Sequence, residues 1–392
     1  MSSPTILPTL CQCGTRLSAQ QRAQPELECR MQNAECRVQN AECRVQEIIA
    51  HRSSHTRHPL VTTHLETLHC KGKSPRNRQP TGHSQSIPLP ASTARSSLCS
   101  RLLAMDDASL VYTECRYGDH DLQKVGVWEL PGTPGAGAAE GDWIIFIHGG
   151  AWRDPRKLHQ GFLPSIRSLL ASDAWPRLRP LVRGFASIDY RLSPHPEFPQ
   201  DPASTPPETY RDARHPDHVL DVYAALSFLQ NKYGFAHRHI LLGHSAGATM
   251  AYQLLMGSSA LGNHAPPDIT LPRVVVGISG IYELVGLDER HNGNYASFIS
   301  AAFGDDRNAW NNSMPARFPG SFNTALGERK AVLAWSPDDT LVDEPEIDGM
   351  TRKLQQDGVS PTIVKTLKGD HDFVWEDGHQ VARLIQTVLL DL

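Results

Sequence analysis

Residues 240–256 read Ile-Leu-Leu-Gly-His-Ser-Ala-Gly-Ala-Thr-Met-Ala-Tyr-Gln-Leu-Leu-Met, and this stretch decides the fold. The apolar run 240–242 predicts a buried strand, and 248–256 predicts a helix. Between them lies a Gly-x-Ser-x-Gly motif, whose small residues let a strand and a helix pack closely around a sharp turn. Such a turn projects a serine hydroxyl above the sheet, so the sequence predicts Ser245 as a nucleophile. The motif also occurs by chance, so the hypothesis depends on partners elsewhere in the chain.

Short β-rich runs alternate with helical patterns after residue 108, which is typical of an α/β fold with a mostly parallel central sheet and helices on both faces. Helical spacing is clearest at 218–232 and at about 378–390. Segment 283–326 breaks the alternation, and it is either a small cap inserted over the strand ends or an irregular surface connection. The predicted strands are 109–116, 124–130, 143–147, 240–242, 274–278, 331–335 and 362–367, with a further one ending at 188–190.

The first 104 residues differ in composition from the rest of the chain. They are rich in Ser, Thr, Arg, Gln and Pro, so we expect a disordered leader or a mis-predicted extension, followed by a catalytic domain at 105–392. A seven-residue repeat covers 28–47, but its apolar positions do not have coiled-coil spacing, which favours a short helix without a partner. We hypothesise that Met105 is the true translation start, and abundant native peptides from before Met105 would contradict this.

Charge divides the chain near the same position. Residues before Met105 carry 13 Lys and Arg against 6 Asp and Glu, whereas the whole chain has a net charge of −4. The remainder is therefore acidic, which argues against nucleic acid as the principal partner. No run of eighteen apolar residues is present, so we expect neither a transmembrane helix nor a membrane partner.

Cysteine usage bears on the compartment. Seven of the eight cysteines precede residue 105, which argues against a disulfide framework in the catalytic part and predicts a reduced, cytoplasmic protein. No Cys or His spacing supports a metal site. Residues 1–23 faintly resemble a mitochondrial presequence, but Pro4 and Pro8 would interrupt its amphipathic helix.

A nucleophilic serine needs a base, and the base needs an acid that orients it. Proteins with this motif carry the acid on a loop after a later strand. The polar loop 336–342 qualifies and contains both Asp338 and Asp339. We favour Asp339, because Asp338 directly follows Pro337 in the turn and is suited to a turn or helix-cap role.

The base is expected on a loop after the final strand. His371 lies in the glycine-containing loop 368–373, after both Ser245 and Asp339 in the chain. His379 is the other histidine this late, but it falls in the predicted last helix. We therefore predict His371 as the base, although a histidine in such a loop is often merely exposed.

A loop of unusual composition follows the predicted strand 143–147. It reads His148-Gly149-Gly150-Ala151-Trp152, and glycines there allow backbone N–H groups to turn toward a substrate. A developing oxyanion needs such preorganised donors. We predict Gly150 and Ala151 as donors together with Ala246, the residue after the nucleophile. The alternative is a tight loop without this role.

Several segments of the chain together resemble one known family. They are His148 to Pro155, Gly243 to Ala248, Ser279 to Tyr282, and the loops of Asp339 and His371. With these segments the chain resembles fungal kynurenine formamidase, a family of α/β hydrolases. The resemblance covers essentially 109–392, and it implies an α/β-hydrolase fold with a Ser245, Asp339 and His371 triad. It also implies hydrolysis of N-formyl-L-kynurenine to L-kynurenine and formate in tryptophan degradation, without a metal or organic cofactor. A homodimer is compatible with it.

Further roles follow from the same resemblance. His148 and Gly149 belong to the motif that shapes the substrate pocket, and Trp152 either walls the site against an aromatic ring or simply packs beside the strand. Arg153 and Arg191 are available cations for a substrate carboxylate. Two rivals remain: a carboxylesterase or lipase-like hydrolase of short acyl esters, and a non-catalytic receptor or adhesion module. The second is disfavoured because no triad member is missing.

Overall fold

The computed structural model describes residues 99–100, 110–132, 141–262 and 264–392. They belong to one unit of the chain, Pro90–Leu392. The repeat at 28–47 and the presequence-like residues 1–23 lie outside the described residues. The leader therefore remains a prediction, except that Cys99 and Ser100 form a short strand of the sheet.

The described strands form one nine-stranded sheet in the order β1-β2-β3-β5-β4-β6-β7-β8-β9. Pairing is antiparallel from β1 to β5 along this order and parallel from β5 to β9, which confirms the predicted mostly parallel sheet. The strands are β1 Cys99–Ser100, β2 Val111–Arg116, β3 Lys124–Glu129, β4 Asp142–Ile147, β5 Val182–Ile188, β6 His239–His244, β7 Val274–Ile278, β8 Lys330–Ala334 and β9 Thr362–Val364.

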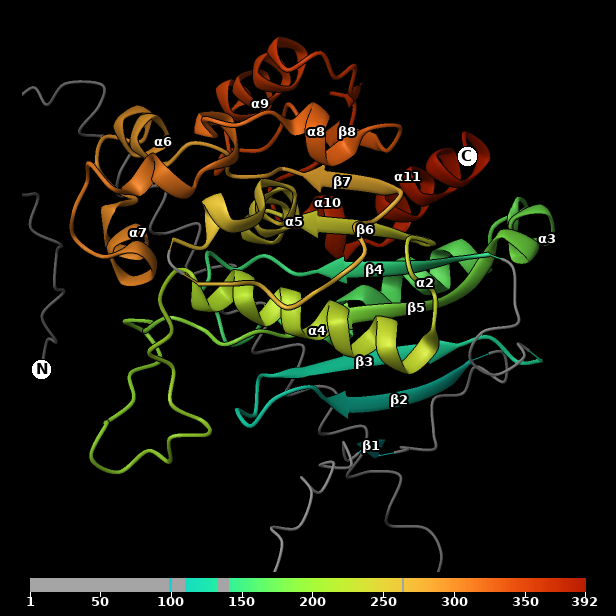
Figure 1. Ribbon diagram of the computed structural model, residues 1–392, viewed down its shortest axis with the longest axis horizontal. Helices are drawn as coiled ribbons and strands as arrows, with labels where there is room; N and C mark the ends of the chain where they lie inside the picture. The colour runs from blue at the N-terminus through green and yellow to red at the C-terminus, as the bar shows by residue number, and fades with distance from the viewer. Residues whose placement is uncertain (1–98, 101–109, 133–140, 263) are drawn as a thin grey trace, which may run out of the picture. The chain divides into compact units, whose positions relative to one another are not determined.

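Helices cover both faces of this sheet (Figure 1). The α-helices are α2 Leu163–Leu170, α3 Trp175–Leu178, α4 Asp217–Tyr233, α5 Ala246–Met256, α6 Leu284–Arg290, α7 Ala296–Phe303, α8 Phe322–Leu326, α9 Glu344–Gln356, α10 Phe373–Glu376 and α11 His379–Leu390. Short 3-10 helices are η1 His159–Phe162, η2 Arg179–Leu181, η3 Gly257–Ala260, η4 Trp310–Ser313 and η5 Pro315–Arg317.

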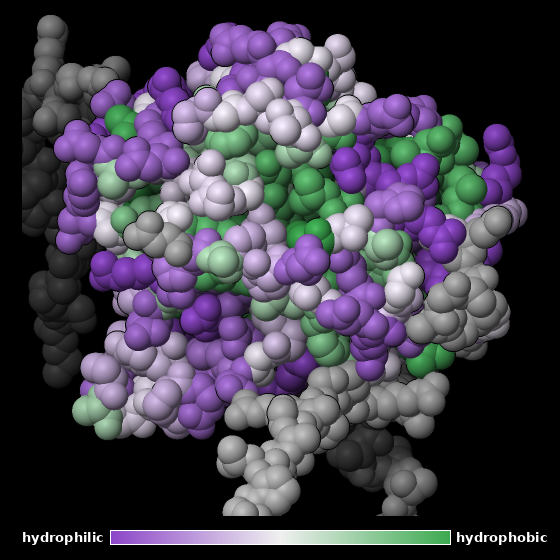
Figure 2. All heavy atoms as spheres, viewed as in Figure 1, coloured by the Kyte–Doolittle hydropathy of each residue, from purple (hydrophilic) through white to green (hydrophobic). Residues whose placement is uncertain are grey.

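The core has two parts because side chains alternate between the faces of each strand. Along β4, Trp143, Ile145 and Ile147 join the buried cluster that contains α4, α5 and α9. Ile144 and Phe146 join the cluster on the other face, with α2 and α11. Each buried side chain of this size contributes ~1.5–3 kcal/mol. Polar residues cover much of the face shown in Figure 2, and hydrophobic residues gather in its central part.

The segment predicted as a cap or an irregular connection contains α6, α7, η4, η5 and α8. Figure 1 shows α6 and α7 beyond the carboxyl ends of β6 and β7, which is the edge where ligands bind in such sheets. The segment is therefore helical at this edge, as a cap requires.

Cys115 of β2 is disulfide-bonded, so the expectation of a fully reduced catalytic part is wrong at this residue. The expectation treated the residues before and after residue 104 as separate parts of the protein. In the structure β1, which precedes that residue, pairs with β2, which follows it. Among the described residues, none of the helices has both the length and the apolar character that a bilayer crossing requires.

Candidate active site

Ser245 lies on the sharp turn between β6 and α5, with a φ of 52°. This is the left-handed region, which non-glycine residues adopt rarely and at a cost of ~1–3 kcal/mol. A hydrogen bond of 2.9 Å from its N–H to the carbonyl of Ile278 holds the turn in place. A Cβ on Gly247 would lie 2.2 Å from the carbonyl oxygen of Ile147, and one on Gly243 would lie 2.3 Å from that of Gly247. Both flanking positions therefore need glycine.

His371 and Asp339 meet although 32 residues separate them in the chain. Nδ1 of His371 lies 2.8 Å from Oδ2 of Asp339, and Oδ1 of Asp339 accepts N–H groups from Leu341 and Val342 at 3.0 and 2.9 Å. Burial alone would raise the pKa of Asp339, but the hydrogen bond and the charge of His371 outweigh it and hold that pKa below its usual value. The carboxylate is thus an ionised acceptor.

Asp338, the competing acid, points elsewhere. Its Oδ2 accepts the N–H of Gly369 at 2.9 Å, which ties the loop of Asp339 to the loop of His371. The side chain that reaches His371 is that of Asp339.

His244, the residue before the serine, is a partner that the sequence did not reveal. Its Nε2 lies 2.9 Å from the backbone carbonyl of His371, and the two rings are 4.6 Å apart. Burial lowers the pKa of His244 well below its usual value, so the ring is neutral. Nε2 must then carry a proton, which it donates to the carbonyl of His371. This hydrogen bond holds the loop of His371 in place.

The loop after β4 has three consecutive residues in the left-handed region: Gly150, Ala151 and Trp152, with φ of 93°, 48° and 59°. Within the described part of the chain, the N–H groups of Gly150 and Ala151 donate to no backbone carbonyl. The N–H of Ala246 is the first of α5, and a first-turn N–H has no acceptor within its helix. All three predicted donors therefore have an N–H available.

Tyr190 supports the loop after β4 by contacts with its backbone. Its hydroxyl lies 3.2 Å from the carbonyl oxygen of His148 and 3.0 Å from that of Gly149, and its ring stacks on His148 at 4.5 Å. A Cβ on Gly149 would lie 2.9 Å from Cβ of Ser245, so glycine lets the loop approach the serine.

A pocket of about 260 Å³ brings these groups together. Both Ser245 and His371 line it, as do Gly150 and Ala151 of the loop. Its other lining residues are Arg153, Asp154, Lys157, His195, Ile281, Tyr295, Phe298, Leu341, Val342 and Asp372.

Trp152 does not line this pocket, so it does not form the wall that was one of its two predicted roles. The side chain is 1% exposed and packs on Phe298 and Phe303, with ring centroids 6.4 and 5.0 Å apart. The packing alternative holds, and the aromatic wall comes instead from Tyr295 and Phe298 of the cap. His148 is also buried, beneath the loop rather than in the pocket.

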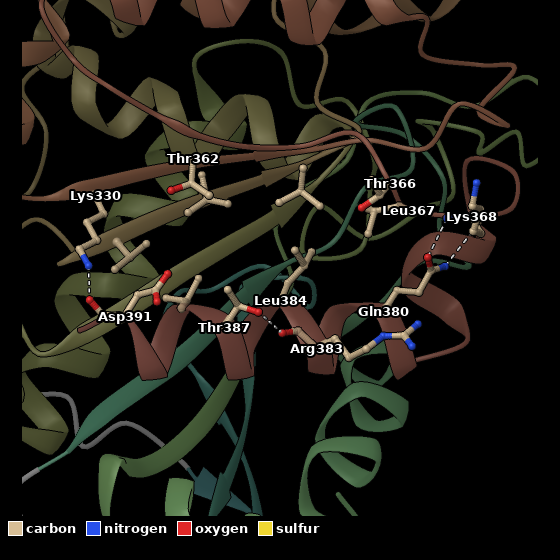
Figure 3. Close-up of a pocket in the computed structure, with 14 residues that line it drawn as sticks. Lys330, Thr362, Thr366, Leu367, Lys368, Gln380, Arg383, Leu384, Thr387 and Asp391 are labelled. Carbon is tan, nitrogen blue, oxygen red and sulfur yellow. Dashed lines mark hydrogen bonds between the residues drawn. The ribbon is translucent and has the colours of Figure 1, made fainter. Parts of the chain in front are cut away.

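A larger cavity, of about 440 Å³, lies between the β8–β9 edge and α11 (Figure 3). Some of its polar groups bond to one another: Gln380 exchanges two hydrogen bonds with the backbone of Lys368, and Lys330 contacts the carbonyl of Asp391. None of the predicted catalytic residues lines it, so it offers no comparable chemistry.

One group of side chains has the spacing of metal ligands within the described residues: His244, His371 and Asp372, whose ligand atoms lie within 4.8 Å of one another. Each histidine already uses one ring nitrogen. Nε2 of His244 contacts the carbonyl of His371, and Nδ1 of His371 contacts Asp339. A metal there would occupy the remaining nitrogen of the predicted base. The arrangement therefore favours acid–base chemistry at His371.

Comparison with known proteins finds several sequence relatives and a shared fold. A kynurenine formamidase-like hydrolase of Fusarium equiseti is 34% identical over 273 residues, which cover 67% of this chain and 88% of that protein. A kynurenine formamidase of Aspergillus versicolor is 32% identical over 254 residues, 59% of this chain and 83% of that one. Esterase B of Lactobacillus rhamnosis has a TM-score of 0.53 at 15% identity, over 72% of this chain and 87% of its own, and confirms the α/β-hydrolase fold. No protein-family model matches the chain.

Proposed function

The chain belongs to the kynurenine formamidase-like hydrolase family, and from this premise we propose that it hydrolyses N-formyl-L-kynurenine to L-kynurenine and formate. Ser245 is the nucleophile, His371 the base and Asp339 the acid that orients it. The observation that carries the proposal is the 2.8 Å contact between His371 and Asp339, because His371 lines the same pocket as Ser245.

The first half-reaction forms a formyl-serine. Since Nδ1 of His371 faces Asp339, its Nε2 is the nitrogen left to take the proton of the Ser245 hydroxyl. The serine Oγ attacks the formyl carbon, and the carbonyl oxygen becomes an oxyanion. Backbone N–H groups of the loop and of α5 stabilise that charge, a contribution of about 3–4 kcal/mol per donor in studied cases.

The tetrahedral oxyanion then collapses to the formyl-serine, and the bond between the formyl carbon and the nitrogen breaks. The imidazolium of His371 gives its proton to the departing aromatic amine, and Asp339 stabilises the cation until then. A water molecule, deprotonated by the same imidazole, then attacks the formyl carbon. The bond between that carbon and Oγ of Ser245 breaks, the imidazolium returns its proton to Oγ, and formic acid leaves and ionises to formate. The steps consume one water and leave the enzyme unchanged.

The pocket walls suit an aromatic amine. Phe298 and Tyr295 present rings from the cap, and Ile281 and Val342 add apolar surface beside Ser245. Aromatic side chains pair favourably with an aryl ring in offset or edge geometry. These contacts support an aryl formamide as substrate.

Two measurements test the function. The values of kcat/KM for N-formyl-L-kynurenine and for a short acyl ester are compared on the same preparation, and we expect the formamide to be preferred. A strong preference for the ester would instead favour the carboxylesterase alternative. A fluorophosphonate probe should label Ser245, and absence of labelling would favour a non-catalytic module.

A further inference from the structure

Arg153 stands out among the cations of the pocket because no carboxylate binds it. Its Nη1 is buried without a hydrogen-bond partner, and among the described residues it forms no ion pair. Lys157, also in the pocket, is engaged at 3.0 Å by Asp372 and at 2.6 Å by Glu376. Arg153 is therefore the pocket cation that is left to receive an anion.

The nearest acidic groups do not neutralise Arg153. Asp154 is held by Arg156 through a bidentate pair, with both contacts at 2.9 Å. Glu197 acts on Arg153 only by its charge, and it is exposed to solvent. Burial lowers the pKa of Arg153 from its usual value, yet a guanidinium remains charged at neutral pH. A partly desolvated cation without a partner is costly, so a ligand anion placed there would be stabilised.

The aromatic wall positions the guanidinium. Cζ of Arg153 lies 5.6 Å from the ring centroid of Phe298, a cation–π distance, and Phe298 itself lines the pocket. Arg153 and Phe298 thus contribute a positive charge and an aromatic ring to the same pocket as Ser245. An aryl group and an anion on one ligand match these two groups.

Arg191, the other arginine considered as a partner for a substrate carboxylate, is already paired with an acidic residue. Arg191 binds Asp221 with Nε at 2.9 Å and Nη2 at 2.8 Å from its carboxylate oxygens. It does not line the pocket of Ser245. Its charge supports the fold of the strand-to-helix connection and is not offered to a substrate.

We propose that Arg153 binds a carboxylate of the substrate and makes the pocket selective for anionic, amino-acid-derived aryl formamides over neutral ones. The inference rests on the proposed function and names the substrate class of the same site. Arg153 determines specificity through binding and takes no part in the proton transfers of Ser245 and His371.

The test compares a carboxylate substrate with a neutral analogue. N-formyl-L-kynurenine and its α-carboxamide are assayed with the full chain, with Arg153→Gln and with Arg153→Lys. A charge-assisted hydrogen bond implies a loss of about 10- to 100-fold in kcat/KM for the acid, mostly in KM, with the amide changed less than about threefold. Arg153→Lys should recover part of the loss.

Arg167→Gln is the matched control, because Arg167 is an exposed arginine of α2 outside the pocket. It removes the same charge and should leave both substrates unchanged. If Arg153→Gln lowers both substrates equally, or lowers neither, the inference is overturned.

A second pair of substrates separates this inference from the proposed function. If the full chain cleaves neither formamide, the proposed function fails, and an aryl acetate with a distal carboxylate is compared with its carboxamide. A preference for the anionic acetate that disappears in Arg153→Gln would uphold the inference alone. Equal rates on the two acetates in the full chain would overturn it.

Discussion

Nδ1 of His371 lies 2.8 Å from Oδ2 of Asp339, while the other carboxylate oxygen accepts two backbone N–H groups. An ionised carboxylate has no proton to share, so the hydrogen of this contact belongs to Nδ1. Nε2 is thereby left as the nitrogen with a free lone pair, and the tautomer suits a base. The contact thus sets both the orientation and the protonation pattern of the imidazole.

The neighbouring acids give the first prediction. Asp339→Asn should lower kcat for N-formyl-L-kynurenine by about 10³- to 10⁴-fold, because an amide favours the wrong tautomer of His371. Asp338→Asn is the control: its side chain contacts the N–H of Gly369, and asparagine can still accept that bond. It should stay within a few-fold of the unmodified protein. Equal losses in the two variants would reject Asp339 as the orienting acid.

The pH profile gives the second prediction. Only neutral imidazole can accept the serine proton, so kcat/KM for N-formyl-L-kynurenine should fall as the pH drops. The pKa of Asp339 lies below its usual value, so the carboxylate that contacts the imidazole stays ionised while the rate falls. The measurement is the acid limb of the pH–rate profile. A flat limb would argue against His371 as base.

Glu346 in α9 gives the third prediction, on stability. Its carboxylate accepts the N–H groups of Tyr282 and Glu283 at 2.6 and 2.8 Å, and burial raises its pKa to about 7 from 4.5. A raised carboxyl pKa means that the folded state binds the proton more tightly than the unfolded state. The resulting stability is present below about pH 4.5 and is lost as the pH rises through about 7, by roughly 3 kcal/mol.

Urea unfolding of the full chain at several pH values, with Glu346→Gln as comparison, measures this effect. Glutamine can still accept both N–H groups but does not titrate, so the variant should lack the decline between these pH values. An identical pH dependence in the two proteins would show that Glu346 does not titrate in this window.

The turn that carries Ser245 gives the fourth prediction. Gly247→Ala places a methyl group against the backbone of β4, which cannot move aside cheaply. We expect a loss of ~1–3 kcal/mol or more in the free energy of unfolding, together with loss of activity. Gly349→Ala is the control, since its methyl group would meet nothing closer than 3.8 Å inside α9. That change should stabilise the protein by ~0.5–1 kcal/mol, and equal effects of the two substitutions would contradict the packing argument.

Local patterns were enough to predict the framework. The apolar runs at 143–147 and 274–278 match β4 and β7 within one residue, because strands buried on both faces leave continuous apolar sequence. The helix α9 was missed although Ile347, Met350 and Leu354 are buried at helical spacing. Its many charged residues, which cover the exposed face, concealed that pattern.

Contacts between distant segments could not be predicted in the same way. Trp152 packs against Phe298, but the sequence around neither residue indicates this contact. Only the positions of both side chains show that Arg191 is paired with Asp221. Likewise, the contact of His244 with the carbonyl of His371 joins residues 127 positions apart.

The central claim is that Ser245 cleaves the formyl group of N-formyl-L-kynurenine. The most direct measurement is release of formate and L-kynurenine by the full chain and by Ser245→Ala, with circular dichroism to verify that the variant is folded. We predict turnover by the full chain and a loss of at least about 10⁴-fold in the folded variant. Undiminished turnover by Ser245→Ala, or no turnover of this substrate by the full chain, would contradict the account.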